Sequence, residues 1–211
     1  MDGLAELRAL EQRDSELADR GKRLHQAADE AAALRVRAEE IDAFFAGYPA
    51  AETRARAAVG AAEADLAARR AGLADAETEL AAATGEERDA AERAVARARD
   101  HLQIAEGRVE RAVADRDALE QTAASLPQEL PELAVRAAAI AEGEPPGDAP
   151  RELADWAARM QASLFVAAGQ IDTQRERVIR EANELATMLL GEPTYGATPA
   201  QARARVEATI R

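Results

Sequence analysis

The feature that most constrains this chain is the recurrence of leucine and other apolar residues at every seventh position. In the first segment, one such row consists of Leu10, Leu17, Leu24, Ala31, Ala38 and Phe45. Seven residues make about two turns of an α-helix, so the row places apolar side chains along one narrow face that must pack against another helix. A disordered polar tract would need no such spacing. The spacing therefore predicts long helices that pack side by side.

Alanine determines how closely these helices can pack. The 211-residue chain contains 57 alanines, whereas aromatic residues make up only 3% of it, so a broad core of large side chains cannot be built. Alanine has the highest helix propensity and lets helix axes approach to about 8 Å. We therefore expect an all-α protein, an elongated antiparallel coiled coil or up-down bundle of about four long helices with short C-terminal helices.

Glycine and proline mark where the helices of the region 1–141 are expected to end. The first helix is expected over about residues 2–46, because Gly47, Tyr48 and Pro49 follow it and proline cannot continue the hydrogen-bond ladder. The apolar rows then predict helices over 51–83 and 86–124, with a short helix over 131–141.

A linker and a second region complete the expected organisation. The sequence EGEPPGDAP, residues 142–150, is rich in proline and glycine and predicts a linker. The region 151–211 is expected to contain a long helix, from about Pro150 to Leu190, that packs back on the bundle. Thr198 and Pro199 have the character of an N-cap and a first helical residue, which predicts a short final helix.

Two structures are open for the polar sequence TGEERD, which begins at Thr84. The apolar rows before and after it are out of register, because fourteen residues beyond Leu80 is Ala94 rather than Val95. In one structure, Thr84 and Glu87 form a capping box after a tight turn, and residues 51–83 and 86–124 make a helical hairpin. In the other, a single helix continues through the polar patch. We favour the hairpin because its two segments have matching lengths.

The sequence contains no arrangement of residues that is typical of catalysis or of metal binding. It has no cysteine, and its two histidines, His25 and His101, lie in neither the Glu-x-x-His pattern of di-iron bundles nor the HExxH pattern. Glycine-rich phosphate-binding motifs are also absent from it. We therefore expect a protein that is not an enzyme, with no catalytic or metal-binding residues, no cofactor and no small-molecule substrate.

The charge distribution bears on the class of partner. The formal net charge is −13, which opposes binding to nucleic acid or to anionic lipid. Acidic and basic residues are interspersed, and i,i+4 pairs such as Asp65 with Arg69 are typical of solvated helix faces. No apolar run approaches about 18 residues, and the amino terminus has charges where a signal peptide needs an apolar stretch. We expect neither nucleic acid nor a membrane as a partner, and a cytoplasmic location.

One aromatic cluster is a candidate docking site. Phe44, Phe45 and Tyr48 are three of the six aromatic residues in the chain, and they lie at the expected end of the first helix. They could cap one end of the bundle, or they could form a docking tip for a partner protein. In the hairpin structure, we expect this cluster and Trp156 to meet at the same end of the bundle.

These features favour a structural or interaction protein, a coiled-coil scaffold or adaptor that self-associates or binds protein partners. Two other interpretations are open. A helical hairpin followed by further helices, over about the first 125 residues, resembles the phage-shock and ESCRT-III class, which implies a membrane-remodelling scaffold. The heptad texture is also similar to the arms of SMC-type ATPases, which implies a chromosome-associated coiled coil. The sequence MDGLAELRALEQRD is acidic, whereas membrane remodelling would call for a basic amphipathic helix at the amino terminus.

Overall fold

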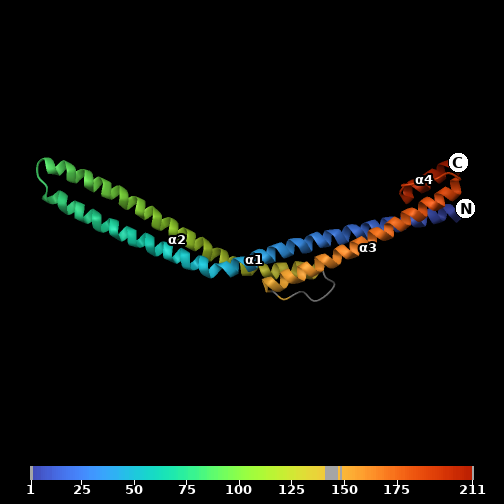
Figure 1. The fold of residues 1–211 in the computed structure, drawn as a ribbon, viewed down its shortest axis with the longest axis horizontal. Coiled ribbons are helices and arrows are strands. Elements are labelled where there is room, and N and C mark those ends of the chain that lie inside the picture. The colour runs from blue at the N-terminus through green and yellow to red at the C-terminus, as the bar shows by residue number, and fades with distance from the viewer. Residues whose placement is uncertain (1, 141–146, 148, 211) are drawn as a thin grey trace. The chain divides into compact units, whose positions relative to one another are not determined.

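A computed structural model describes residues 2–140, 147 and 149–210 of the chain. These residues form four α-helices and no strand (Figure 1). The helices are α1 (Asp2–Ala82), α2 (Glu86–Ile140), α3 (Pro150–Leu190) and α4 (Pro199–Ile210). This result confirms the all-α class that the heptad pattern predicts. Most of the expected linker 142–150 lies outside the described residues.

The helices contribute to two compact units. Unit 1 comprises Met1–Glu39 and Glu132–Arg211, and unit 2 comprises Glu40–Pro131. The first part of α1 and the last part of α2 therefore belong to unit 1, together with α3 and α4. The rest of α1 and α2 makes up unit 2.

The first helix does not end at Gly47–Tyr48–Pro49, so that prediction is wrong, and α1 continues to Ala82. A proline inside a helix removes one backbone hydrogen bond and typically costs about 3 kcal/mol. In α1, however, buried and half-buried positions recur on one face on both sides of the proline, at Ile41, Phe45, Tyr48, Glu52, Ala55 and Val59. Packing along this face stabilises the helix across Pro49.

The second helix also continues through prolines. The expected helices 86–124 and 131–141 are one helix, α2, which includes Pro127 and Pro131. Leu126 and Leu133, on either side of Pro131, are 7% and 5% exposed, so packing again continues across the proline. The described residues therefore contain three long helices rather than about four.

Unit 2 is a helical hairpin, which confirms the structure favoured from the sequence. Arg99 of α2 pairs with Glu77 of α1 at 3.0 Å, and Arg108 of α2 pairs with Asp65 of α1 at 3.3 Å. The earlier residue of α1, Asp65, thus pairs with the later residue of α2, Arg108. The two helices are therefore antiparallel. The connection contains Gly85 at a φ of 61°, a left-handed conformation that glycine adopts without steric cost.

The capping box expected at this turn is not formed. Within the described residues, Thr84 makes no hydrogen bond with Glu87. A box with Thr84 as N-cap requires the helix to begin at Gly85, but α2 begins one residue later, at Glu86. The Gly85 carbonyl accepts the first helical hydrogen bond, from the Arg88 amide at 3.2 Å. Gly85 thus occupies the capping position, and Thr84 lies outside it.

Unit 1 packs α3 antiparallel to the first part of α1. Asp14 of α1 accepts a hydrogen bond from Arg175 of α3 at 3.0 Å. A short distance farther along α1, Gly21 lies against Ile171, close enough that an added Cβ would be 3.4 Å from the Ile171 Cγ2 atom. The end of α2 joins this unit through an ion pair of Arg136 with Glu30 at 3.3 Å.

After α3, the chain turns back along the helix in an extended segment, residues 191–198, which we call the strap. Gly191 caps α3 in the left-handed conformation, with its amide donating to the Thr187 carbonyl at 2.9 Å. The Thr194 amide donates to the Thr187 hydroxyl at 2.9 Å. The Asn183 side chain donates to the Ala197 carbonyl at 2.8 Å and accepts from the Ala197 amide at 3.3 Å. These contacts fix the strap on α3.

The strap leads to α4, which begins as the sequence predicts. The Thr198 hydroxyl accepts from the Gln201 amide at 3.3 Å, and the Gln201 side chain accepts from the Thr198 amide at 2.9 Å. This reciprocal pair is a capping box, and Pro199 is the first residue of the helix. A core of side chains from α1, α3, the strap and α4 lies beneath it, consisting of Leu7, Ala182, Ala186, Ala197, Ala202 and Val206.

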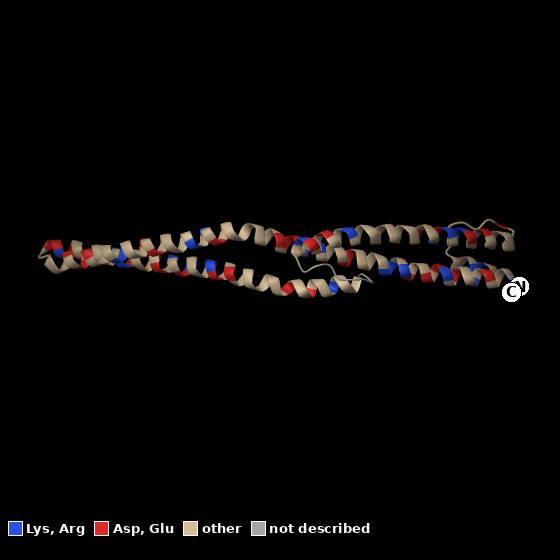
Figure 2. Ribbon diagram, turned by 90° about the horizontal axis from the view of Figure 1, so that it is seen from below, with Lys and Arg blue, Asp and Glu red and all other residues tan. Residues whose placement is uncertain are grey.

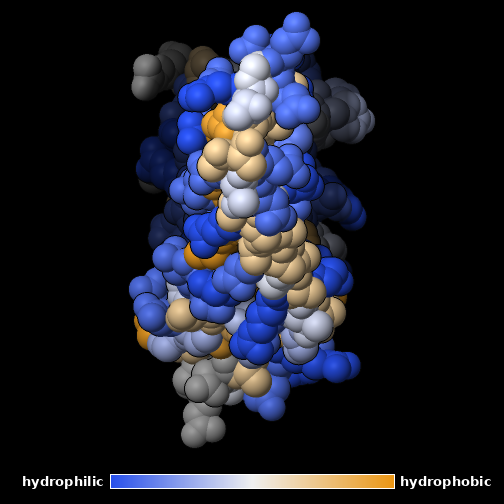
Figure 3. Space-filling view, turned by 90° about the vertical axis from the view of Figure 1, so that its left-hand side faces the viewer, coloured by the Kyte–Doolittle hydropathy of each residue, from blue (hydrophilic) through white to orange (hydrophobic). Residues whose placement is uncertain are grey.

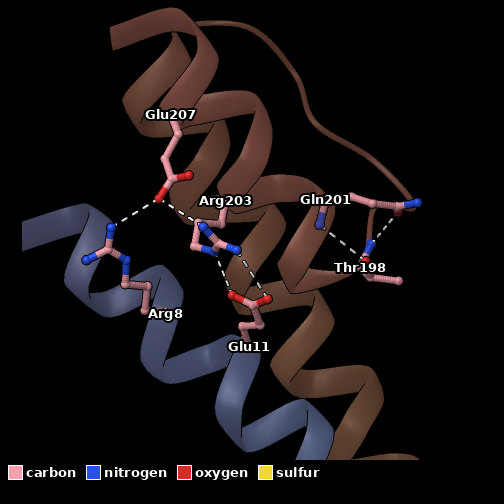
Figure 4. A network of polar contacts seen from close by, with 6 residues as sticks. All are labelled: Arg8, Glu11, Thr198, Gln201, Arg203 and Glu207. Carbon is pink, nitrogen blue, oxygen red and sulfur yellow. Dashed lines mark hydrogen bonds and ion pairs between the residues drawn. The ribbon is translucent and has the colours of Figure 1, made fainter. Parts of the chain in front are cut away.

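Charged side chains join α4 to α1 (Figure 4). Arg203 donates to Glu11 at 2.6 Å and pairs with Glu207 at 2.9 Å, and Arg8 donates to Glu207 at 3.2 Å. Hydrogen bonds from Arg203 and then from Arg8 lower the pKa of the Glu207 carboxyl below its ordinary value of 4.5. The folded state therefore favours the ionised carboxylate.

This network predicts a pH-dependent contribution of Glu207 to stability. Because its pKa is lower in the folded chain, the carboxylate stabilises the fold above pH 4.5, and this contribution is lost as the pH falls through the lowered pKa. The difference in melting temperature between wild type and Glu207→Gln should therefore shrink as the pH is lowered from about 6 to about 3. Thermal unfolding at a series of pH values measures it. Glu192→Gln, at an exposed position of the strap, is the control. A wild-type advantage that stays constant with pH would contradict the prediction.

Candidate functional site

The aromatic cluster predicted as a capping or docking site lies within α1, in unit 2. The Phe44 ring contacts the Phe45 ring edge to face at a centroid distance of 5.4 Å, and it lies 5.8 Å from the Tyr48 ring. All three side chains are half-buried. Because α1 continues beyond them, they do not mark the end of a helix as the sequence predicted.

Trp156, the fourth predicted residue, is half-buried on α3. It belongs to unit 1, whereas Phe44, Phe45 and Tyr48 belong to unit 2. The structure therefore brings three of the four predicted residues together. The predicted meeting of the cluster with Trp156 stays a prediction, and so does the docking of a partner at the cluster.

The described residues offer few groups for chemistry. They contain no group of three or more His, Asp and Glu side chains placed to hold a metal ion. His25 makes a hydrogen bond of 2.9 Å between its Nδ1 atom and the Gly21 carbonyl of its own helix. None of the helices in the described ranges combines the length and the apolar character needed to cross a membrane.

A more distinctive feature is a groove between the two helices of unit 2. Its first part is a hollow of about 520 Å³ with an alanine floor and charged rims, lined by Arg54, Ala55, Ala58, Arg108, Arg111, Ala112 and Asp115. Its second part is a hollow of about 240 Å³ lined by Asp65, Arg69, His101, Ile104 and Arg108. Arg108 lines both parts, so they adjoin. We call the two parts together the arginine groove.

The charge of the arginine groove is opposite in sign to that of the chain. Four arginines and two aspartates line it, a formal balance of +2 with His101 neutral, whereas the whole chain carries −13. Asp65 accepts from both Arg69, at 3.1 Å, and Arg108, at 3.3 Å. One carboxylate is thus shared between two guanidinium groups, which leaves positive charge uncompensated.

The other two arginines of the groove have no carboxylate partner. Arg54 makes no ion pair or hydrogen bond within the described part of the chain. Arg111 donates only to a backbone carbonyl, that of Gly107, at 3.0 Å. Both side chains are exposed. The groove therefore presents guanidinium groups that are free to meet anionic groups of a partner.

Reasoning from the sequence missed this groove. Along the helices, basic residues are interspersed with acidic ones, as Figure 2 shows. The arginines come together only because the hairpin places residues 54–69 beside residues 101–115. Folding the sequence at Gly85 and pairing positions across the turn would have revealed them.

Comparison of the chain with protein-family models, with curated proteins and with solved structures finds no match.

Proposed function

We propose that this chain is a non-enzymatic structural or interaction protein, a helical scaffold or adaptor that binds protein partners or a second copy of itself through coiled-coil packing. The observation that carries the proposal is the small number of buried apolar side chains in unit 2. Only five apolar residues of this 92-residue hairpin are buried, namely Ile41, Val59, Val95, Ala105 and Leu126. The described part of unit 1 has 18 such residues.

A two-helix hairpin leaves most of each helix surface uncovered. Ile104 is 52% exposed, and alanines line the open face of the hairpin at several levels. In the view of Figure 3, a stripe of weakly hydrophobic side chains lies between hydrophilic ones. Small side chains let a further helix approach closely, and burial of apolar area stabilises the contact. These features support a role in binding other helices.

The proposal includes a cytoplasmic location. The chain has no cysteine, so its fold does not depend on the oxidising compartments in which disulfides form. Fractionation of the source cells checks the location, and recovery outside the cytoplasm would contradict it.

The binding role can be tested with the full chain. A tagged copy is purified from its native source, and each co-purifying protein is then produced separately and mixed with the chain in analytical ultracentrifugation. We expect a stable complex with a protein partner or a concentration-dependent oligomer. A chain that remains a monomer, forms no complex with the co-purified proteins, and instead co-sediments with anionic liposomes or shifts DNA at low salt would overturn the proposal.

A further inference from the structure

We propose that the arginine groove of unit 2 is the docking site for an acidic amphipathic helix of a partner protein. This inference rests on the proposed function, and it names the partner's chemistry and the side chains that bind it. The groove lies wholly within the hairpin formed by residues 40–131. Its occupant is a third helix that lies along the two helices of the hairpin.

The shape of the groove favours a helix. Its floor consists of Ala55, Ala58 and Ala112, whose short side chains allow a third helix axis to approach to about 8 Å. From Arg54 to Arg69, the groove extends along α1 for about 22 Å at 1.5 Å per residue, which is about four helical turns. Ile104, half exposed at 52%, offers an apolar contact in the second part of the groove.

The charge of the groove favours an acidic partner. Arg54 and Arg111 have no carboxylate partner in the described residues, and Arg69 and Arg108 share Asp65. Glutamates or aspartates on both flanks of a docked helix would complete these pairs with charge-assisted hydrogen bonds. Such pairs at the rim of an interface accelerate association and select the partner.

The same observations argue against nucleic acid as the occupant. A phosphate backbone needs a track of basic groups, but Asp65 and Asp115 lie within the groove and the chain as a whole is strongly acidic. An alanine floor gives no stacking surface for bases, for which aromatic side chains are the usual platform. A helix with a small apolar face and acidic flanks can pack against the alanine floor and place its carboxylates beside the arginines of the rims.

The test uses the full chain and two synthetic fluorescent peptides of about 18 residues, a length that spans the groove. One is a helix with alanine and leucine on one face and glutamate on both flanks, and the other has lysine at every glutamate position. Fluorescence anisotropy measures the binding of each peptide to wild type, to Arg54→Gln/Arg111→Gln, and to a control with equal loss of charge, Arg13→Gln/Arg20→Gln. Circular dichroism confirms that each variant is folded.

We expect the acidic peptide to bind wild type and the control equally, and to bind Arg54→Gln/Arg111→Gln about tenfold more weakly. The lysine peptide should bind none of them. Equal binding of both peptides, or equal weakening by the control, would overturn the docking site. Duplex DNA that binds through Arg54 and Arg111 would overturn it too, as would a wild-type dimer that the double variant dissociates.

Different results would refute the docking site and the scaffold function. A native partner that Arg54→Gln/Arg111→Gln retains with unchanged affinity would refute the groove as its docking site, and the scaffold function would stand. A chain that forms neither a complex with native proteins nor an oligomer of its own would refute the scaffold function, whatever the peptides do.

Discussion

Replacement of Leu7 with alanine is expected to destabilise unit 1 by about 2 to 5 kcal/mol, the usual range for truncating a fully buried leucine. The Leu7 side chain is 0% exposed and lies in the core where α1, α3, the strap and α4 meet. Truncation removes apolar contacts and leaves a cavity that the surrounding helices fill only in part. Because α4 has twelve residues and is too short to be stable alone, we expect it to loosen first.

Urea unfolding followed by circular dichroism measures the loss of stability, and amide hydrogen exchange shows whether α4 loses protection before α3. Leu10→Ala is the matched control, since Leu10 is on the same helix and packs against the same core but is only partly buried. Leu10→Ala should lower the free energy of unfolding clearly less than Leu7→Ala. Equal losses for the two variants would show that Leu7 is not the centre of this core.

The matching lengths of the segments on either side of Gly85 favoured a hairpin over one continuous helix. The heptad spacing itself predicted that the chain is helical. It could not predict that α1 continues through Pro49, because the local cost of a proline is visible in the sequence whereas the packing that offsets it is not. The first heptad row is also buried only in part. Leu10, Leu17 and Leu24 are half-buried, whereas Ala31 and Ala38 of the same row are fully buried.

Contact with α3 lies on a neighbouring face of α1 that includes Leu7, Asp14 and Gly21. Gly21 lies against Ile171, and the neighbouring polar position, Asp14, is satisfied by Arg175. A fully buried leucine, a half-buried aspartate that is paired with an arginine, and a buried glycine thus share this face. Side-chain size alone therefore does not predict burial on this part of α1, where Gly21 is buried and Leu24 is half-buried.

The candidate sites differ in how far a sequence can reveal them. The aromatic cluster is local, so its members were found, although the expected helix end was not. The arginine groove depends on residues about 30 to 60 positions apart in the chain, and on which carboxylates the arginines share. An acidic net charge therefore coexists with a basic surface, because charge summed along the chain says little about charge on one face.

Asn183→Ala is expected to release the strap from α3 and to destabilise unit 1 by roughly 2 to 4 kcal/mol. The Asn183 amide is 8% exposed, and it both donates to and accepts from the backbone of Ala197. Its loss leaves a buried amide and a buried carbonyl of Ala197 without partners, and each such group typically costs about 1 to 3 kcal/mol. Amide exchange of Ala197 and of α4 should accelerate.

Thr194→Val in the same strap is expected not to lower the stability of unit 1. Thr194 is 1% exposed, and its hydroxyl oxygen has no hydrogen-bond partner within the described residues. Valine has nearly the same shape, so it keeps the packing and removes an unsatisfied polar group, which makes the change neutral or stabilising. Thermal unfolding measures the stability of Asn183→Ala and Thr194→Val relative to wild type. If Asn183→Ala were as mild as Thr194→Val, the hydrogen bonds to Ala197 would not hold the strap in place, and packing around Ala197 and Val206 would have to account for it.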